Sequence, residues 1–144
     1  MDTKWQRNSA THVHIVFKKA ERVITANSEK VIRHHNLTPS QFSVVDILYT
    51  KGEMRVSRLL EKILATSGNM TVILRNMERD GLIYRNCYAK DKRVSVIGLT
   101  EKGRKLFEKI LPDHKKDLEK LYSILTDEEK VTFISIMKKF KEII

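Results

Sequence analysis

Apolar residues recur at helical spacing along most of the first half of the chain. Between Val13 and Val31 they stand three and four positions apart, which predicts one long amphipathic helix. A second helix is predicted after "LTPSQF", because Thr38 is a good cap and Pro39 suits the first helical position. The stretch "VSRLLEKI" then predicts a short helix over residues 56–63.

The next stretch changes from helical spacing to β-forming residues. In "ATSGNMTVILRNMERDG" a helix is predicted over residues 67–80, with Gly81 as its stop and an inner face made of Met70, Ile73, Leu74 and Met77. "LIYRNCYA" and "RVSVIGLT" then predict two strands. The four residues between their cores, 89–92, are expected to form the loop of a hairpin.

The last third of the chain returns to helical spacing. A helix is predicted to open at Thr100, and Pro112 is expected to kink or interrupt it. Thr126 and Glu129 have the spacing of a capping box, which predicts the start of a last helix. One face of that helix is apolar and holds Phe133, Ile136, Met137, Phe140 and Ile144. The predicted fold class is therefore mostly α (α+β), with one two-stranded hairpin.

Charge is concentrated in one segment. The chain has 144 residues, enough for one domain, and a net charge of +10. Residues 51–105 hold 13 Lys and Arg against 6 Asp and Glu, whereas residues 106–144 hold 8 of each. A local surplus of this kind is typical of a surface that binds a polyanion.

The order of the central elements is that of a winged helix-turn-helix, in which the second helix of the motif enters the major groove of DNA. If its apolar face is buried, a polar or small-residue strip faces outward, and small residues at its start let the backbone approach phosphates. We expect DNA contacts from Ser67, Gly68, Asn69, Thr71, Val72 and Arg75. Arg79 is left out because Glu78 and Asp80 are available to pair with it.

Three motifs between Leu37 and Leu106 resemble the MarR family of transcriptional regulators: "LTPSQF", "MERDGLIYR" and "DKRVSVIGLTEKG". The resemblance implies that residues 37–105 form the DNA-binding lobe and that the helices within 1–36 and 106–144 form a homodimer. It also implies that Asp91, Lys92 and Arg93 form the wing signature, with Arg93 in the minor groove and Asp91 orienting basic side chains. A narrow, negative minor groove suits such an arginine.

The resemblance further implies a dimeric repressor that binds an inverted repeat of double-stranded DNA and is released by a small aromatic or phenolic effector. Many relatives carry a basic residue where this chain has Val72. Base preference is therefore expected to depend on methyl contacts with thymine.

Other classes of protein have little support in the sequence. No apolar run approaches the roughly 20 residues of a membrane span, and no secretory signal precedes the first helix, so a cytoplasmic location is expected. The lone Cys87 is interpreted as a small strand residue, and neither His34 with His35 nor His12 with His14 has metal-ligand spacing. No catalytic motif stands out, so we expect no enzyme activity, no cofactor and no metal.

Two alternatives remain open from the residues alone. A winged-helix fold can instead present its surface to a partner protein, although the basic central segment disfavours this. An architectural DNA-binding protein without sequence preference is the other alternative, because it would need the same positive surface.

Overall fold

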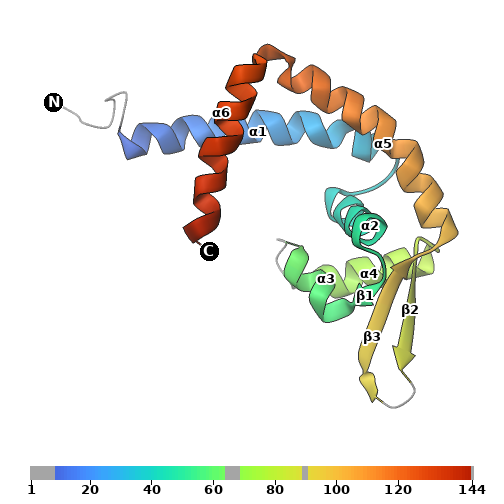
Figure 1. Cartoon of the computed structure of the whole chain (residues 1–144). Coiled ribbons are helices and arrows are strands. Elements are labelled where there is room, and N and C mark those ends of the chain that lie inside the picture. Colours follow the sequence, from blue (N-terminus) through green and yellow to red (C-terminus); the bar gives the residue numbers. More distant parts are fainter. Residues whose placement is uncertain (1–8, 64–68, 89–90, 144) are drawn as a thin grey trace. The chain divides into compact units, whose positions relative to one another are not determined.

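The computed structural model describes residues 9–63, 69–88 and 91–143, and places residues 88 and 91–93 by their backbone alone. The chain divides into two compact units. The first contains Met1–Ser28 and Lys115–Ile144, and the second contains Glu29–His114. The long helices α1 (Ala10–His34) and α5 (Glu101–Leu121) each contribute to both units. The elements are labelled in Figure 1.

The second unit contains a small helical core and a sheet. After the end of α1 it comprises α2 (Pro39–Lys51), β1 (Met54–Arg55), α3 (Val56–Lys62), α4 (Met70–Arg79), β2 (Ile83–Tyr88), β3 (Asp91–Leu99) and the first part of α5. This order confirms the predicted winged helix-turn-helix.

The start of α2 is capped as the sequence predicts. The Thr38 hydroxyl accepts a hydrogen bond from the Gln41 backbone N–H (3.2 Å), and the Gln41 side chain accepts one from the Thr38 N–H (3.0 Å). Pro39 follows as the first helical residue. The helix ends before Gly52, whose φ of 84° is in a region that residues with a Cβ rarely adopt.

The sheet has three antiparallel strands in the order β1-β3-β2. The strand β1 was not predicted from the sequence; it pairs Met54 with Ile97 of β3. The predicted four-residue hairpin loop at 89–92 was wrong in part, because Asp91 and Lys92 belong to β3 and Asp91 is the partner of Tyr88. The register shifts next to this pair, between Cys87 and Tyr88. An irregular register arises from the pairing of the two strands, and the β-forming preferences of single residues do not predict it.

The hydrophobic core forms around one face of α4. Met70, Leu74 and Met77 are at most 1% exposed, as predicted, and Ile73 packs partly buried against the same cluster. They meet apolar side chains of α2, α3, β3 and α5, among which the fully buried ones are Val44, Val45, Leu59, Ile97 and Ile110. Burying each such side chain stabilises the fold by about 1.5–3 kcal/mol, so α4 has one favoured rotation about its axis.

The turn between α4 and β2 is joined to the start of α5 through Thr100. The Thr100 hydroxyl donates to the Gly81 carbonyl (2.5 Å) and accepts from the Gly103 N–H (3.0 Å). The Thr100 N–H donates to the Leu82 carbonyl (3.1 Å). Gly81, with φ of 75°, supplies the turn that ends α4, as the sequence predicted.

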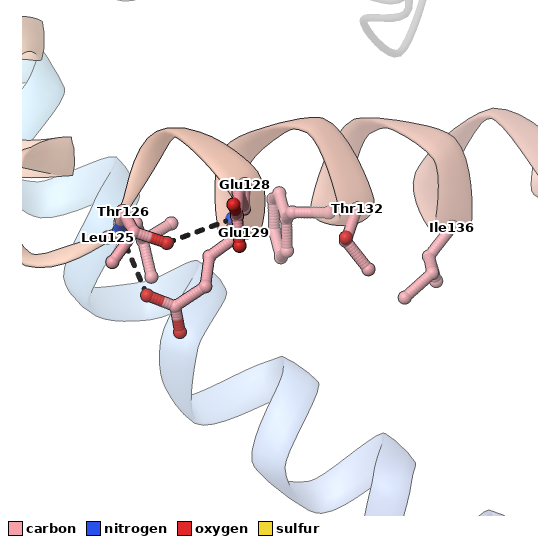
Figure 2. Close-up of a pocket in the computed structure, with 7 residues that line it drawn as sticks. Leu125, Thr126, Glu128, Glu129, Thr132 and Ile136 are labelled. Atoms are coloured by element: carbon pink, nitrogen blue, oxygen red, sulfur yellow. Dashed lines mark hydrogen bonds between the residues drawn. The ribbon is translucent and has the colours of Figure 1, made fainter.

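The other unit is helical. It contains α1 up to Ser28, α5 from Lys115, η3 (Tyr122–Ile124), α6 (Asp127–Lys139) and η4 (Phe140–Ile143). The predicted capping box at the start of α6 is confirmed, and Figure 2 shows its two hydrogen bonds. Pro112 was expected to kink or interrupt its helix; the interruption was wrong, because α5 is continuous through Pro112.

No helix in the part of the chain that the structure describes is both long and apolar enough to cross a membrane.

We predict that Gly103→Ala destabilises the protein. Alanine normally stabilises a helix by about 1 kcal/mol over glycine, but a Cβ on Gly103 would collide with the Leu82 carbonyl oxygen and lie 2.7 Å from Leu99 Cδ1. The free energy of unfolding should therefore fall by about 1–3 kcal/mol. Urea denaturation measures it, and Lys105→Ala, an exposed change on the same helix, should stay within about 0.5 kcal/mol of the original. An unchanged or raised stability in Gly103→Ala would contradict the contact.

Candidate nucleic-acid interface

The face of α4 opposite the core is exposed and mostly polar. Asn69, Thr71, Val72 and Arg75, all predicted DNA contacts, lie on the exposed side. Asn69 is the N-cap residue, directly before α4, and its side chain makes no capping hydrogen bond. The other two predicted contacts on this segment, Ser67 and Gly68, lie outside the described residues.

The charges along α4 are not equivalent. Arg79 forms an ion pair with Asp80 (Nε to Oδ1, 3.4 Å), as was expected from the acidic residues on either side of it. Glu78 lies 3.8 Å from the Arg85 Nε of β2. Among the described residues, no carboxylate forms an ion pair with Arg75. The exposed guanidinium of Arg75 is therefore the one on α4 that is available to an anion.

The wing signature lies at one end of the hairpin. Asp91, Lys92 and Arg93 are the first three residues of β3, and Leu99, at the other end, leads into Thr100 and α5. Eight residue steps of a strand span about 27 Å. Figure 1 shows β2 and β3 extending away from the helices of their unit.

The base of the wing, which is the end of the hairpin that lies near Tyr84 and Gly98, packs and pairs with β1 and the residue before it. The Tyr84 hydroxyl donates a hydrogen bond to the Glu53 carboxylate, and this bond raises the pKa of Tyr84. The Tyr84 ring also covers Gly98 on β3, where a Cβ would collide with it. Together with the pairing of Met54 and Ile97, these contacts hold the hairpin to the start of α3.

The helix α2 is held against α5 by aromatic contacts. The Tyr49 and Phe107 rings lie 4.6 Å apart between centroids, and the Tyr49 hydroxyl donates to Glu108 (3.1 Å), which raises the pKa of Tyr49. The Arg104 guanidinium lies 5.4 Å from the centre of the Tyr49 ring. The winged motif is thus connected to α5 at two places, through Thr100 and through this cluster.

Sequence reasoning missed a second group of exposed cations, on β1 and α3. Arg55, Arg58 and Lys62 are exposed, and Arg58 and Lys62 line an open pocket of about 360 Å³ with Ser57 and Glu61. In helix-turn-helix proteins the first helix of the motif crosses the phosphate backbone. The sequence contained a pattern that could have predicted this group. Arg58 and Lys62 are four positions apart, so they lie on the same face of the short helix, beside the apolar position Leu59.

The described His, Cys, Asp and Glu side chains include no group of three that could hold a metal ion.

A helix-turn-helix whose second helix has one exposed face, followed by a β-hairpin, is the winged helix-turn-helix fold of many DNA-binding proteins. The chain belongs to the MarR family, whose model matches residues 37–95. The HTH-type transcriptional regulator MhqR of Bacillus subtilis (strain 168) is 34% identical to it over 125 residues, which cover 87% of this chain and 86% of MhqR. The protein is therefore an HTH-type transcriptional regulator.

The solved structures of MepR and NadR are among those that share the fold. MepR of S. aureus, in a complex with DNA, has a TM-score of 0.78 and 24% identity, and the match covers 91% of this chain and 97% of MepR. NadR, in complex with 4-hydroxyphenylacetate, has a TM-score of 0.72 and 21% identity, with 94% of this chain and 95% of NadR covered. At these identities the likeness establishes the winged-helix fold and no more.

Proposed function

We propose that this regulator is a dimeric repressor that binds an inverted-repeat operator and is released by a small-molecule effector in the cytoplasm. The observation that carries the proposal is the exposed face of α4, on which Arg75 is free of carboxylates while the opposite face is locked in the core. The amino-terminal part of α4 enters the major groove, where Arg75 contacts a guanine edge or a phosphate. The wing places Arg93 in the adjacent minor groove, with Asp91 and Lys92 beside it.

The exposed apolar side chains of the first unit support a homodimer. Every described residue that is buried lies within Glu29–His114, and none lies in α6. Large apolar side chains in α1 and from η3 onward are instead exposed: Val13, Val16, Phe17, Val23, Ile124, Val131, Phe133, Ile134, Ile136, Met137, Phe140 and Ile143. A monomer rarely leaves so much apolar surface in water. A second copy of the chain would cover this surface. The two α4 helices of the resulting dimer, one from each copy, would meet major grooves roughly 34 Å apart.

A pocket on α6 lies within this apolar surface. It has a volume of about 430 Å³ and is lined by Leu125, Phe133 and Ile136 together with polar residues at the start of the helix (Figure 2). Glu129, one of the polar lining residues, is occupied in the capping box. We assign this pocket to the dimer contact, because its apolar side chains continue the exposed face of α6.

The effector is proposed by analogy. NadR, which shares the fold, was solved with a phenolic acid, 4-hydroxyphenylacetate. We propose a small aromatic or phenolic ligand for this chain as well. A panel of phenols and aromatic acids added to the preformed operator complex tests this, and release by at least one member is expected.

Selection of bound sequences from random duplex DNA at roughly 150 mM salt tests the operator proposal. An enriched inverted repeat is expected. Retained DNA without enrichment would indicate an architectural role. No retained DNA would favour a winged-helix module that binds a partner protein, whose affinity should respond little to salt.

We predict that Arg75→Ala weakens binding to the selected operator by about 1–3 kcal/mol. Arg79→Ala is the matched control, because Arg79 is one turn further along the same exposed helix and already pairs with Asp80. Fluorescence anisotropy measures both affinities. If both variants lost the same amount of operator affinity, Arg75 would have no specific role in recognition.

We predict that Arg93→Ala weakens binding and reduces the preference for A·T pairs beside the half-sites. The slope of the logarithm of the binding constant against the logarithm of the salt concentration should become shallower by about one. Arg93→Lys keeps the charge and should keep more of the affinity than of the A·T preference. Titrations at several salt concentrations on operators with A·T-rich and G·C-rich flanks measure both effects. An unchanged flank preference in Arg93→Ala would exclude the minor-groove role.

We predict that the double change Phe133→Glu and Ile136→Glu dissociates the dimer, because it puts two charges into an apolar contact. Ser135→Glu is the control, since residue 135 lies about 200° around the helix from Phe133. Analytical ultracentrifugation at micromolar concentration measures the mass, and far-UV circular dichroism verifies the helices. A double variant that stays dimeric would place the dimer contact elsewhere.

A further inference from the structure

Val72 is exposed where an apolar side chain has no partner within the chain. It is 46% exposed on the outer face of α4. Among the described residues of Glu29–His114, the other exposed large apolar side chains are Leu60, at 37%, and Leu111, at 40%. Val72 is thus the most exposed of the three, and it lies in the middle of the proposed recognition face.

The neighbours of Val72 show which surface it faces. Asn69, Val72 and Arg75 follow one another at intervals of three residues, and all three are exposed. Residues three apart are neighbours on a helix surface. Val72 is therefore flanked along the helix by an amide and by the guanidinium of Arg75. A helix that places Arg75 against DNA brings Val72 against the same groove.

The chemistry of Val72 limits what it can contact there. Its side chain has no hydrogen-bonding atom, so it gains nothing from phosphates or from the polar edges of bases. The apolar group that the major groove offers is the C5 methyl of thymine. A valine in a helix has one strongly preferred χ1 rotamer, so little side-chain entropy is lost when this contact forms.

We propose that Val72 reads the 5-methyl group of one thymine in each half-site, within about one or two base steps of the base or phosphate that Arg75 contacts. The separation follows from the helix rise, because three residues span about 4.5 Å and a base step about 3.4 Å. This inference rests on the proposed function, since it requires α4 to lie in the major groove. It names Val72 as a specificity-determining residue.

The test replaces thymines of the selected operator with deoxyuridine, which lacks only the methyl group. Each thymine is replaced singly and then at the symmetry-related positions of both half-sites, and affinity is measured by fluorescence anisotropy. Replacing the contacted thymine in one half-site should weaken binding about fourfold, the equivalent of about 0.8 kcal/mol for one buried methyl. Replacing it in both half-sites should weaken binding about 15-fold.

Protein variants test whether Val72 is the side chain that contacts the thymine methyl. Val72→Ala should bind the thymine operator more weakly and lose the sensitivity to uracil at that position. Arg75→Ala should be weaker overall and keep the uracil penalty. Thr71→Ser, which removes the methyl of the exposed neighbour, and Leu111→Ala, which truncates another exposed apolar side chain, should also keep the penalty.

The outcomes separate this inference from the function on which it rests. If an inverted repeat is bound and no uracil weakens binding, or if Val72→Ala keeps the full penalty, the role of Val72 is wrong and the operator proposal stands. Loss of the uracil penalty in Thr71→Ser, instead of in Val72→Ala, would likewise overturn the role of Val72. If selection enriches no sequence, the operator proposal and the role of Val72 fall together.

Discussion

The hydrogen bonds of Thr100 are the constraint on which the arrangement of the DNA-binding lobe depends. One hydroxyl connects the Gly81 carbonyl, where α4 has just ended, to the Gly103 N–H at the start of α5. Gly103 lies so close to the Leu82 carbonyl that no side chain fits between them. The end of α4, the base of the wing and the start of α5 are thereby fixed to one another. The Lys102 ammonium adds a bond to the Asp80 carbonyl (2.8 Å).

The burial that stabilises α4 also orients its exposed face. Met70, Leu74 and Met77 together contribute several kcal/mol when they are buried, and turning the helix by one residue would expose part of that surface. The outward direction of Arg75 and Val72 is thus set by side chains that make no contact with a ligand. An interface on a rigid helix requires little ordering when it binds, which leaves more of the contact energy for affinity.

Local features were predictable from the sequence and tertiary ones were not. The caps at Thr38 and Thr126 were predicted because a helix cap involves only residues close together in sequence. Only the one at Thr126 was predicted as a capping box; the reciprocal bond from Gln41 to Thr38 was not. The exposed strip Asn69, Thr71, Val72 and Arg75 followed from helical periodicity alone. Strand β1 was missed because two residues carry no period, and only the pairing with β3 makes them a strand. The Tyr84 bond to Glu53 likewise joins residues 31 positions apart in sequence. The register shift beside Tyr88 is local, but residue preferences carry no signal for it.

The distribution of charge separates affinity from selectivity. The central segment holds 13 basic residues, and such charges attract any phosphate backbone with a strength that falls steeply as salt rises. Phosphate contacts position a protein on DNA and carry no sequence information directly. In the proposed complex, discrimination comes from the few side chains of α4 that reach base edges, and of the exposed residues Thr71, Val72 and Arg75 only Arg75 is charged. A contact by Val72 releases no counterions, so its contribution to selectivity should persist at salt concentrations where most of the affinity is lost.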